Sequence, residues 1–106
     1  MTMRSNENRD AAAAAREMVR RYYDRPERCG TTAIARELGL SPSALCHRYR
    51  LAFDSTIGAD VRRLRIMRAR ELLRDDPDRL LKEIAAEVGY VHAAYRTFMN
   101  AFRSET

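Results

Sequence analysis

The feature that most constrains the fold is a short pattern that occurs twice, fifty residues apart. Ile-Ala-Arg-Glu-Leu-Gly-Leu at 34–40 is matched by Ile-Ala-Ala-Glu-Val-Gly-Tyr at 84–90. In each copy the apolar spacing predicts a short helix, the alanine at its second position (Ala35 or Ala85) permits close helix crossing, and the glycine can leave the helix with a positive φ. After the first copy, Ser41 and Pro42 supply an N-cap and a first-turn residue. This pattern is typical of a helix-turn-helix, and its repetition predicts two such units.

The remainder of the chain predicts an all-α fold. Apolar residues recur at helical spacing, glycine and proline are few, and no strand-like alternation runs for long. We expect about six helices, arranged as two homeodomain-like helix-turn-helix subdomains joined by a long central linker helix. The predicted divisions are a disordered polar tail at 1–10, a first subdomain at 11–54, the linker helix at 56–74 and a second subdomain at 77–106.

The linker is predicted to be the longest helix of the chain. Asp54 lies where the preceding helix should end, because aspartate tolerates the left-handed conformation better than most residues. Thr56 can then cap a new helix that continues to about Arg74. The apolar residues of this segment cover a wide arc, which predicts a helix that is buried on two sides.

Composition favours a nucleic-acid partner inside the cell. The 106 residues carry a formal charge of +5, and every basic residue except Lys82 is an arginine. The planar guanidinium of arginine can donate two parallel hydrogen bonds to a phosphate or to guanine. Coding bias could equally explain the preference for arginine over lysine. The two cysteines have no CxxC spacing, and neither a signal peptide nor a long apolar run is present. We therefore expect a cytoplasmic, nucleoid-associated protein with reduced thiols.

The helix predicted at 42–53 has two distinct faces. Leu45 and Tyr49 belong to its inner face, whereas Ser43, His47 and Arg50 share a small, polar and basic face. Side chains of this kind read base edges when a helix lies in the major groove. The alternative is an ordinary solvated face.

The helix predicted at 92–103 is also two-faced. Its apolar side repeats at helical spacing as core packing does. Arginine can fork onto guanine and asparagine can bond to adenine, so the opposite side is a candidate for base contact, with a solvated face as the alternative. That polar row consists of His92, Arg96, Asn100 and Arg103.

Metal binding and catalysis find little support. Cys46, His47 and His92 are candidate metal ligands, but adjacent side chains on a helix point about 100° apart and do not easily share one ion. The chain has only two histidines, no glycine-rich phosphate loop and no nucleophile paired with a base. We therefore expect no metal, no cofactor and no enzymatic activity.

With both units placed, the chain from about Met18 to Phe102 resembles the DNA-binding domain of the AraC/XylS transcriptional regulators. The resemblance depends on the combination of stretches and on their spacing, not on any single one. These stretches are Ile-Ala at 34–35, Gly-Leu-Ser-Pro at 39–42, Leu45, Tyr-Arg at 49–50, Arg-Leu-Arg-Ile at 63–66, Ala-Arg-Glu-Leu-Leu at 69–73, Glu-Ile-Ala at 83–85 and Val-Gly-Tyr at 88–90.

The resemblance implies seven helices, two helix-turn-helix units on a linker helix, and recognition helices that enter successive major grooves on one side of the duplex. It also implies that Ser43, Cys46 and His47 lie where the first recognition helix contacts bases. The sequence departs from the family at Asp54, which replaces a glycine, and at Arg48, which replaces an apolar residue. After Gly89 the alignment needs a gap, so base contacts in the second helix are assigned from its polar row.

We therefore predict a sequence-specific regulator of transcription that binds double-stranded DNA. The predicted base contacts are Ser43, Cys46, His47, His92, Arg96 and Asn100, and the predicted phosphate contacts are Arg50, Arg62 and Arg103.

The predicted function also implies an oligomeric state and a set of partners. We expect a monomer that resembles the small single-domain family members, acts as an activator, has RNA polymerase as a second candidate partner and does not associate with a membrane. The alternative is a protein-interaction module that binds RNA polymerase or another regulator without reading DNA.

Overall fold

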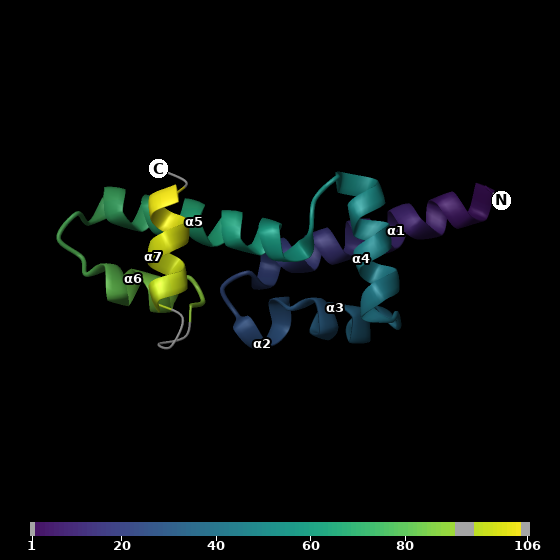
Figure 1. Ribbon diagram of the computed structural model, residues 1–106, viewed down its shortest axis with the longest axis horizontal. Coiled ribbons are helices and arrows are strands. Elements are labelled where there is room, and N and C mark those ends of the chain that lie inside the picture. The colour runs from purple at the N-terminus through teal and green to yellow at the C-terminus, as the bar shows by residue number, and fades with distance from the viewer. Residues whose placement is uncertain (1, 91–94, 105–106) are drawn as a thin grey trace.

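The structure is a computed structural model that describes residues 2–90 and 95–104. Within these ranges the chain forms helices and no strand, which confirms the all-α prediction (Figure 1). One short helix beyond the expected six is present. The helices are α1 (Thr2–Tyr22), α2 (Pro26–Cys29), α3 (Thr31–Leu38), α4 (Pro42–Phe53), α5 (Ile57–Asp75), α6 (Leu81–Glu87) and α7 (Tyr95–Ser104).

Helix α1 begins much earlier than the sequence indicated. Its 21 residues exceed the 19 of α5, so the prediction that the linker is the longest helix is wrong. The disordered tail predicted over 1–10 is wrong for residues 2–10, which continue the helix; Met1 lies outside the described residues. Ala12, Ala15 and Val19 are buried almost completely and anchor the second half of α1. Once a helix is anchored in this way, each further residue adds a hydrogen bond without a new nucleation cost, so the helix extends toward the N-terminus.

The apolar side chains gather in two clusters along an elongated molecule of 55 × 22 × 20 Å. The first cluster joins α1, α2, α3 and α4 to the start of α5, where Ile57 and Val61 are buried. The second joins the later part of α5 to α6 and α7, around the fully buried Ile66 and Phe98. Helix α5 therefore belongs to both clusters, as the wide apolar arc predicted. We call α1 to α4 the first unit and α6 with α7 the second unit.

The helix-turn-helix formed by α3 and α4 is built by local capping. Gly39 ends α3 with a φ of 70°, and the Ser41 hydroxyl accepts a hydrogen bond from the Ala44 amide at 3.2 Å. Asp54 ends α4 with a φ of 51°, so this aspartate adopts the left-handed conformation that glycine adopts most easily. The Thr56 hydroxyl then caps α5 by accepting from the Ala59 amide at 3.1 Å.

Helices α4 and α7 occupy corresponding places in the two halves of the molecule. In Figure 1 both run across the long axis, which α5 follows, and both run in the same chain direction. The turn before α7 contains Gly89, whose φ of 108° is one that residues with a side chain rarely adopt.

A buried carboxylate ties α4 to α5. Asp60 is only 6% exposed and accepts a hydrogen bond from the hydroxyl of the fully buried Tyr49 in α4. It also accepts a 2.8 Å hydrogen bond from Ser55, and Arg63 lies 3.6 Å from it as an ion-pair partner. Burial and the hydrogen bond to Asp60 raise the pKa of the Tyr49 hydroxyl above its ordinary value. The buried carboxylate of Asp60 thus has partners in α4, in α5 and in the turn between them.

This arrangement predicts that Tyr49→Phe lowers the free energy of unfolding by about 1 to 3 kcal/mol at neutral pH, because Asp60 loses a donor. The folded state holds the Tyr49 proton more tightly than the unfolded state, so its contribution is complete below about pH 10 and is lost as pH rises further. Urea unfolding followed by circular dichroism should therefore show a steeper alkaline loss of stability in the wild type than in Tyr49→Phe. Ser55→Ala is the control, because it removes a donor and keeps the titrating tyrosine. Equal alkaline slopes for wild type and Tyr49→Phe would contradict the assignment.

Candidate nucleic-acid interface

The exposed side of α4 carries all the residues that the sequence assigned to it. Ser43, Cys46, His47 and Arg50 are exposed, while the opposite side of the helix is buried. The burial of Leu45 fixes the rotation of α4 about its axis, so the exposed row is directed away from the first cluster.

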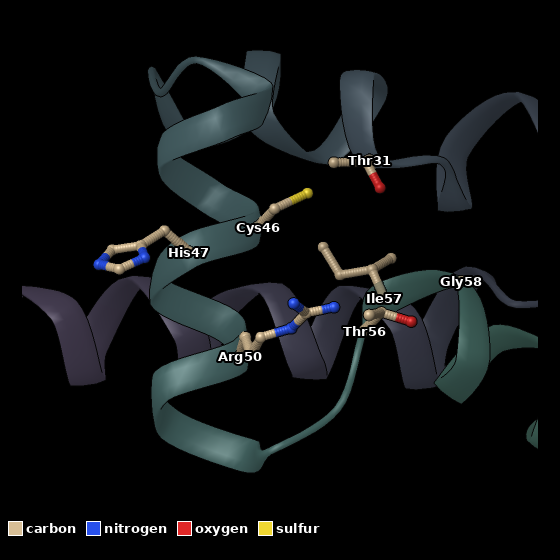
Figure 2. Close-up of a pocket in the computed structure, with 7 residues that line it drawn as sticks. All are labelled: Thr31, Cys46, His47, Arg50, Thr56, Ile57 and Gly58. Atoms are coloured by element: carbon tan, nitrogen blue, oxygen red, sulfur yellow. The ribbon is translucent and has the colours of Figure 1, made fainter.

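A hollow of about 260 Å³ lies beside this row (Figure 2). Cys46 and Arg50 extend from α4 toward Thr31 and Ile57, whereas the His47 ring points away from them. The hollow is lined by Thr31, Cys46, His47, Arg50, Thr56, Ile57 and Gly58.

Two helices begin at this hollow. Thr31 is the first residue of α3 and Ile57 is the first residue of α5, so the N-terminal ends of two helices border it. The start of a helix carries a partial positive charge and unpaired amide groups, and Arg50 adds a guanidinium. The hollow therefore has the chemistry of a site for an anion such as a phosphate.

The exposed side of α7 carries three of the residues predicted for it. Arg96, Asn100 and Arg103 are exposed at i, i+4 and i+7, while Phe98 and Ala101 on the other side are buried. The predicted helix began at His92, but residues 91–94 lie outside the described part of the chain, and α7 is described from Tyr95. The structure therefore describes the polar row from Arg96 onward, without His92.

A second hollow, of about 440 Å³, brings α5 and α7 together. It is lined by Arg62 from α5 and by Thr97, Asn100, Ala101 and Ser104 from α7. The structure therefore places Arg62, a predicted phosphate contact, beside Asn100, a predicted base contact. Arg103 and Arg96 do not line this hollow.

The two hollows border the same side of α5. Gly58 lines the first and Arg62 lines the second, and residues four apart on a helix lie one turn apart on one face. Both side-chain positions are exposed. The exposed rows of α4 and α7 thus flank one side of the central helix.

Several residues of this interface were missed by the sequence analysis. Thr31, Gly58, Thr97 and Ser104 line the hollows, although the sequence analysis assigned none of these side chains to DNA binding. The spacing of Gly58 and Arg62 could have indicated a shared face of α5. No local pattern indicates that the start of α3 lies beside α4, because that proximity comes from tertiary packing.

Other arginines form ion pairs with acidic side chains. Arg68 lies 3.0 Å from Glu71, and Arg79 donates two hydrogen bonds of 3.0 Å to Glu87. The hydrogen bonds from Arg79 hold the pKa of the Glu87 carboxyl below its usual range. These pairs are solvent-exposed, and neither borders the two hollows.

The described residues contain no group of three side chains suited to hold a metal ion. Cys46 and His47 lie on adjacent positions of α4, and His92 falls outside the described ranges. Among the helices that the structure describes, none is both long enough and apolar enough to cross a membrane.

Comparison with known proteins supplies one match. A family model described as a helix-turn-helix domain matches residues 34–106, which is more than half of the chain and extends from within α3 through α7. Searches of curated proteins and of solved structures found no match. The matched family binds DNA and is not a family of enzymes. The chain belongs to the AraC/XylS family of helix-turn-helix DNA-binding domains, whose members regulate transcription.

Proposed function

We propose that this DNA-binding regulator is sequence-specific and reads two adjacent major grooves, with α4 in one groove and α7 in the next. The observation that carries the proposal is the position of the two polar rows, which flank the face of α5 that contains Gly58 and Arg62. The common chain direction of α4 and α7 also supports it (Figure 1). Successive major grooves on one side of a duplex present the same orientation, so two parallel helices suit them.

Base contacts are assigned to the exposed polar side chains of the two helices. On α4, Ser43, Cys46 and His47 offer short side chains that reach base edges only when the helix lies deep in the groove. On α7, Arg96 offers a fork for guanine and Asn100 can bond to adenine in a bidentate manner. The sequence assigns His92 to the same row.

Phosphate contacts are assigned to arginines at the margins of the two helices. Arg50 shares its hollow with the starts of α3 and α5, and Arg62 lies at the hollow between α5 and α7. Arg103 is exposed at the end of the α7 row. Contacts of this kind set the orientation of the protein on the duplex and carry no sequence information directly.

One chain contains both predicted recognition helices, which supports binding as a monomer. Activation of transcription through RNA polymerase, and association with the nucleoid in the cytoplasm, are proposed from the family resemblance. The alternative, an interaction module that does not read DNA, would need an exposed apolar surface. Among the described residues, the large apolar side chains that are exposed are Leu51 in α4, Met67 in α5 and Leu80 in the turn before α6. They lie on three different elements, which gives the alternative less support.

Selection of bound fragments from random duplex DNA tests the proposal as a whole. We expect two enriched half-sites about one helical turn apart, with affinity that falls steeply as salt increases. An affinity that is independent of sequence at every salt concentration would favour the alternative, and a single half-site would show that only one helix reads DNA.

Arg96→Ala should relax sequence preference at one base pair. We expect a loss of about 1 to 3 kcal/mol on the preferred operator and almost none on an operator altered at that pair, because only the preferred base engages the guanidinium fork. Fluorescence anisotropy on both duplexes measures the difference. Asn100→Ala is the matched comparison, because the shift in preference should move to a neighbouring base pair. An equal loss on cognate and scrambled DNA would remove Arg96 from the base contacts.

Arg50→Ala should weaken binding to every sequence alike. If Arg50 neutralises a phosphate, the slope of log affinity against log salt should fall by about 1. Arg68→Ala removes the same charge from an exposed pair on α5 and should leave the slope almost unchanged. The phosphate assignment is wrong if both variants show the same salt slope as the wild type.

A further inference from the structure

Arg65 connects separate parts of the structure from the middle of α5. Its Nε donates a 2.7 Å hydrogen bond to the main-chain oxygen of Tyr23, directly after α1, and one of its terminal nitrogens lies 3.2 Å from the Sγ of Cys29 in α2. Its guanidinium carbon also lies 4.9 Å from the centre of the Tyr90 ring. One half-buried side chain therefore contacts both the first unit and the segment that leads to α7.

The contact with Tyr90 continues into α7 through buried rings. Tyr90 is 7% exposed, and its ring packs edge-on against Phe98 with 5.2 Å between the ring centres. Phe98 is fully buried and belongs to α7, the helix that carries Arg96 and Asn100. A shift of Arg65 would therefore be transmitted to the recognition helix through packed side chains.

The two units also touch at their backbones. A Cβ placed on Gly89 would lie 2.9 Å from the Cα of Asp24 and 3.1 Å from the Nε of Arg65. No side chain fits at 89 without movement of Asp24, which lies in the first unit. We call this set of contacts the Arg65 joint, formed by Tyr23, Asp24, Cys29, Arg65, Gly89 and Tyr90.

The chemistry of the joint requires an arginine. A planar guanidinium can donate in two directions while its face lies over an aromatic ring, whereas a lysine ammonium is a point charge on a flexible stem. The acceptor at Tyr23 follows the C-terminal end of α1, where a cation is favourable. The contacts of Arg65 thus restrict the orientation of the second unit about α5.

We propose that Arg65 is a positioning residue that fixes α7 relative to α4 and thereby makes the protein select operators by the distance between half-sites. This inference rests on the proposed two-groove function. In the proposed complex with DNA, Arg65 itself contacts no base. A rigid connection gives the second contact a high effective concentration only when the half-sites match the spacing of the two helices.

The test compares duplexes that contain both half-sites at the selected spacing with duplexes in which about five base pairs, half a helical turn, are inserted between them. We expect the wild type to prefer the selected spacing by about 100-fold, and Arg65→Ala to reduce that ratio about tenfold. Arg65→Lys keeps the charge and should give an intermediate ratio. Arg68→Ala, a variant of the same charge on the same helix, should keep the wild-type ratio even if its overall affinity falls.

A second measurement without DNA separates the joint from the proposed function. Spin labels on the exposed Cys46 of α4 and on Glu83→Cys of α6 report the distance between the units, with folding checked by circular dichroism. We expect a narrow distance distribution in wild type and Arg68→Ala, and a broad one in Arg65→Ala. Equal widths, or an unchanged spacing ratio in Arg65→Ala, would overturn the positioning role. Absence of two half-sites for the wild type would instead overturn the two-groove function.

Discussion

Ile57 and Ile66 point to opposite sides of α5, because nine residues make about two and a half helical turns. Both are almost completely buried, but Ile57 belongs to the cluster of the first unit and Ile66 to that of the second. Burial of a side chain of this size contributes roughly 1.5 to 3 kcal/mol. Each unit therefore packs against its own half of one continuous helix, and the relative orientation of α4 and α7 depends on this shared helix.

The two-sided burial of α5 leaves a limited part of its surface for a partner. Gly58 and Arg62 lie on the exposed part, between the hollows that α4 and α7 border. Elsewhere on the helix Arg63 and Arg68 pair with Asp60 and Glu71. Neither Asp60 nor Glu71 lines a hollow, and the residues that line the first hollow include Arg50 and no acidic side chain, which favours an anionic partner there.

The sequence predicted the features that depend on local chemistry. The bounds of α4 agree with the predicted 42–53 because Ser41 caps one end and Asp54 ends the other, and both signals lie within a few residues. The tail over 2–10 was predicted wrongly because an anchored helix extends into polar residues that have no apolar pattern of their own. The bonds from Arg65 to Tyr23 and Cys29 span 42 and 36 residues, so no local pattern could indicate them. The base and phosphate roles of the interface stay predictions.

In the proposed function, one rigid helix holds α4 and α7 so that both enter the major groove from the same side of a duplex. Interference by methylation of guanine N7, an atom of the major groove, tests this most directly on a selected operator. We expect two clusters of interfering guanines, centred about ten base pairs apart and therefore on one face of the DNA. A single cluster, or two clusters on opposite faces of the duplex, would contradict it.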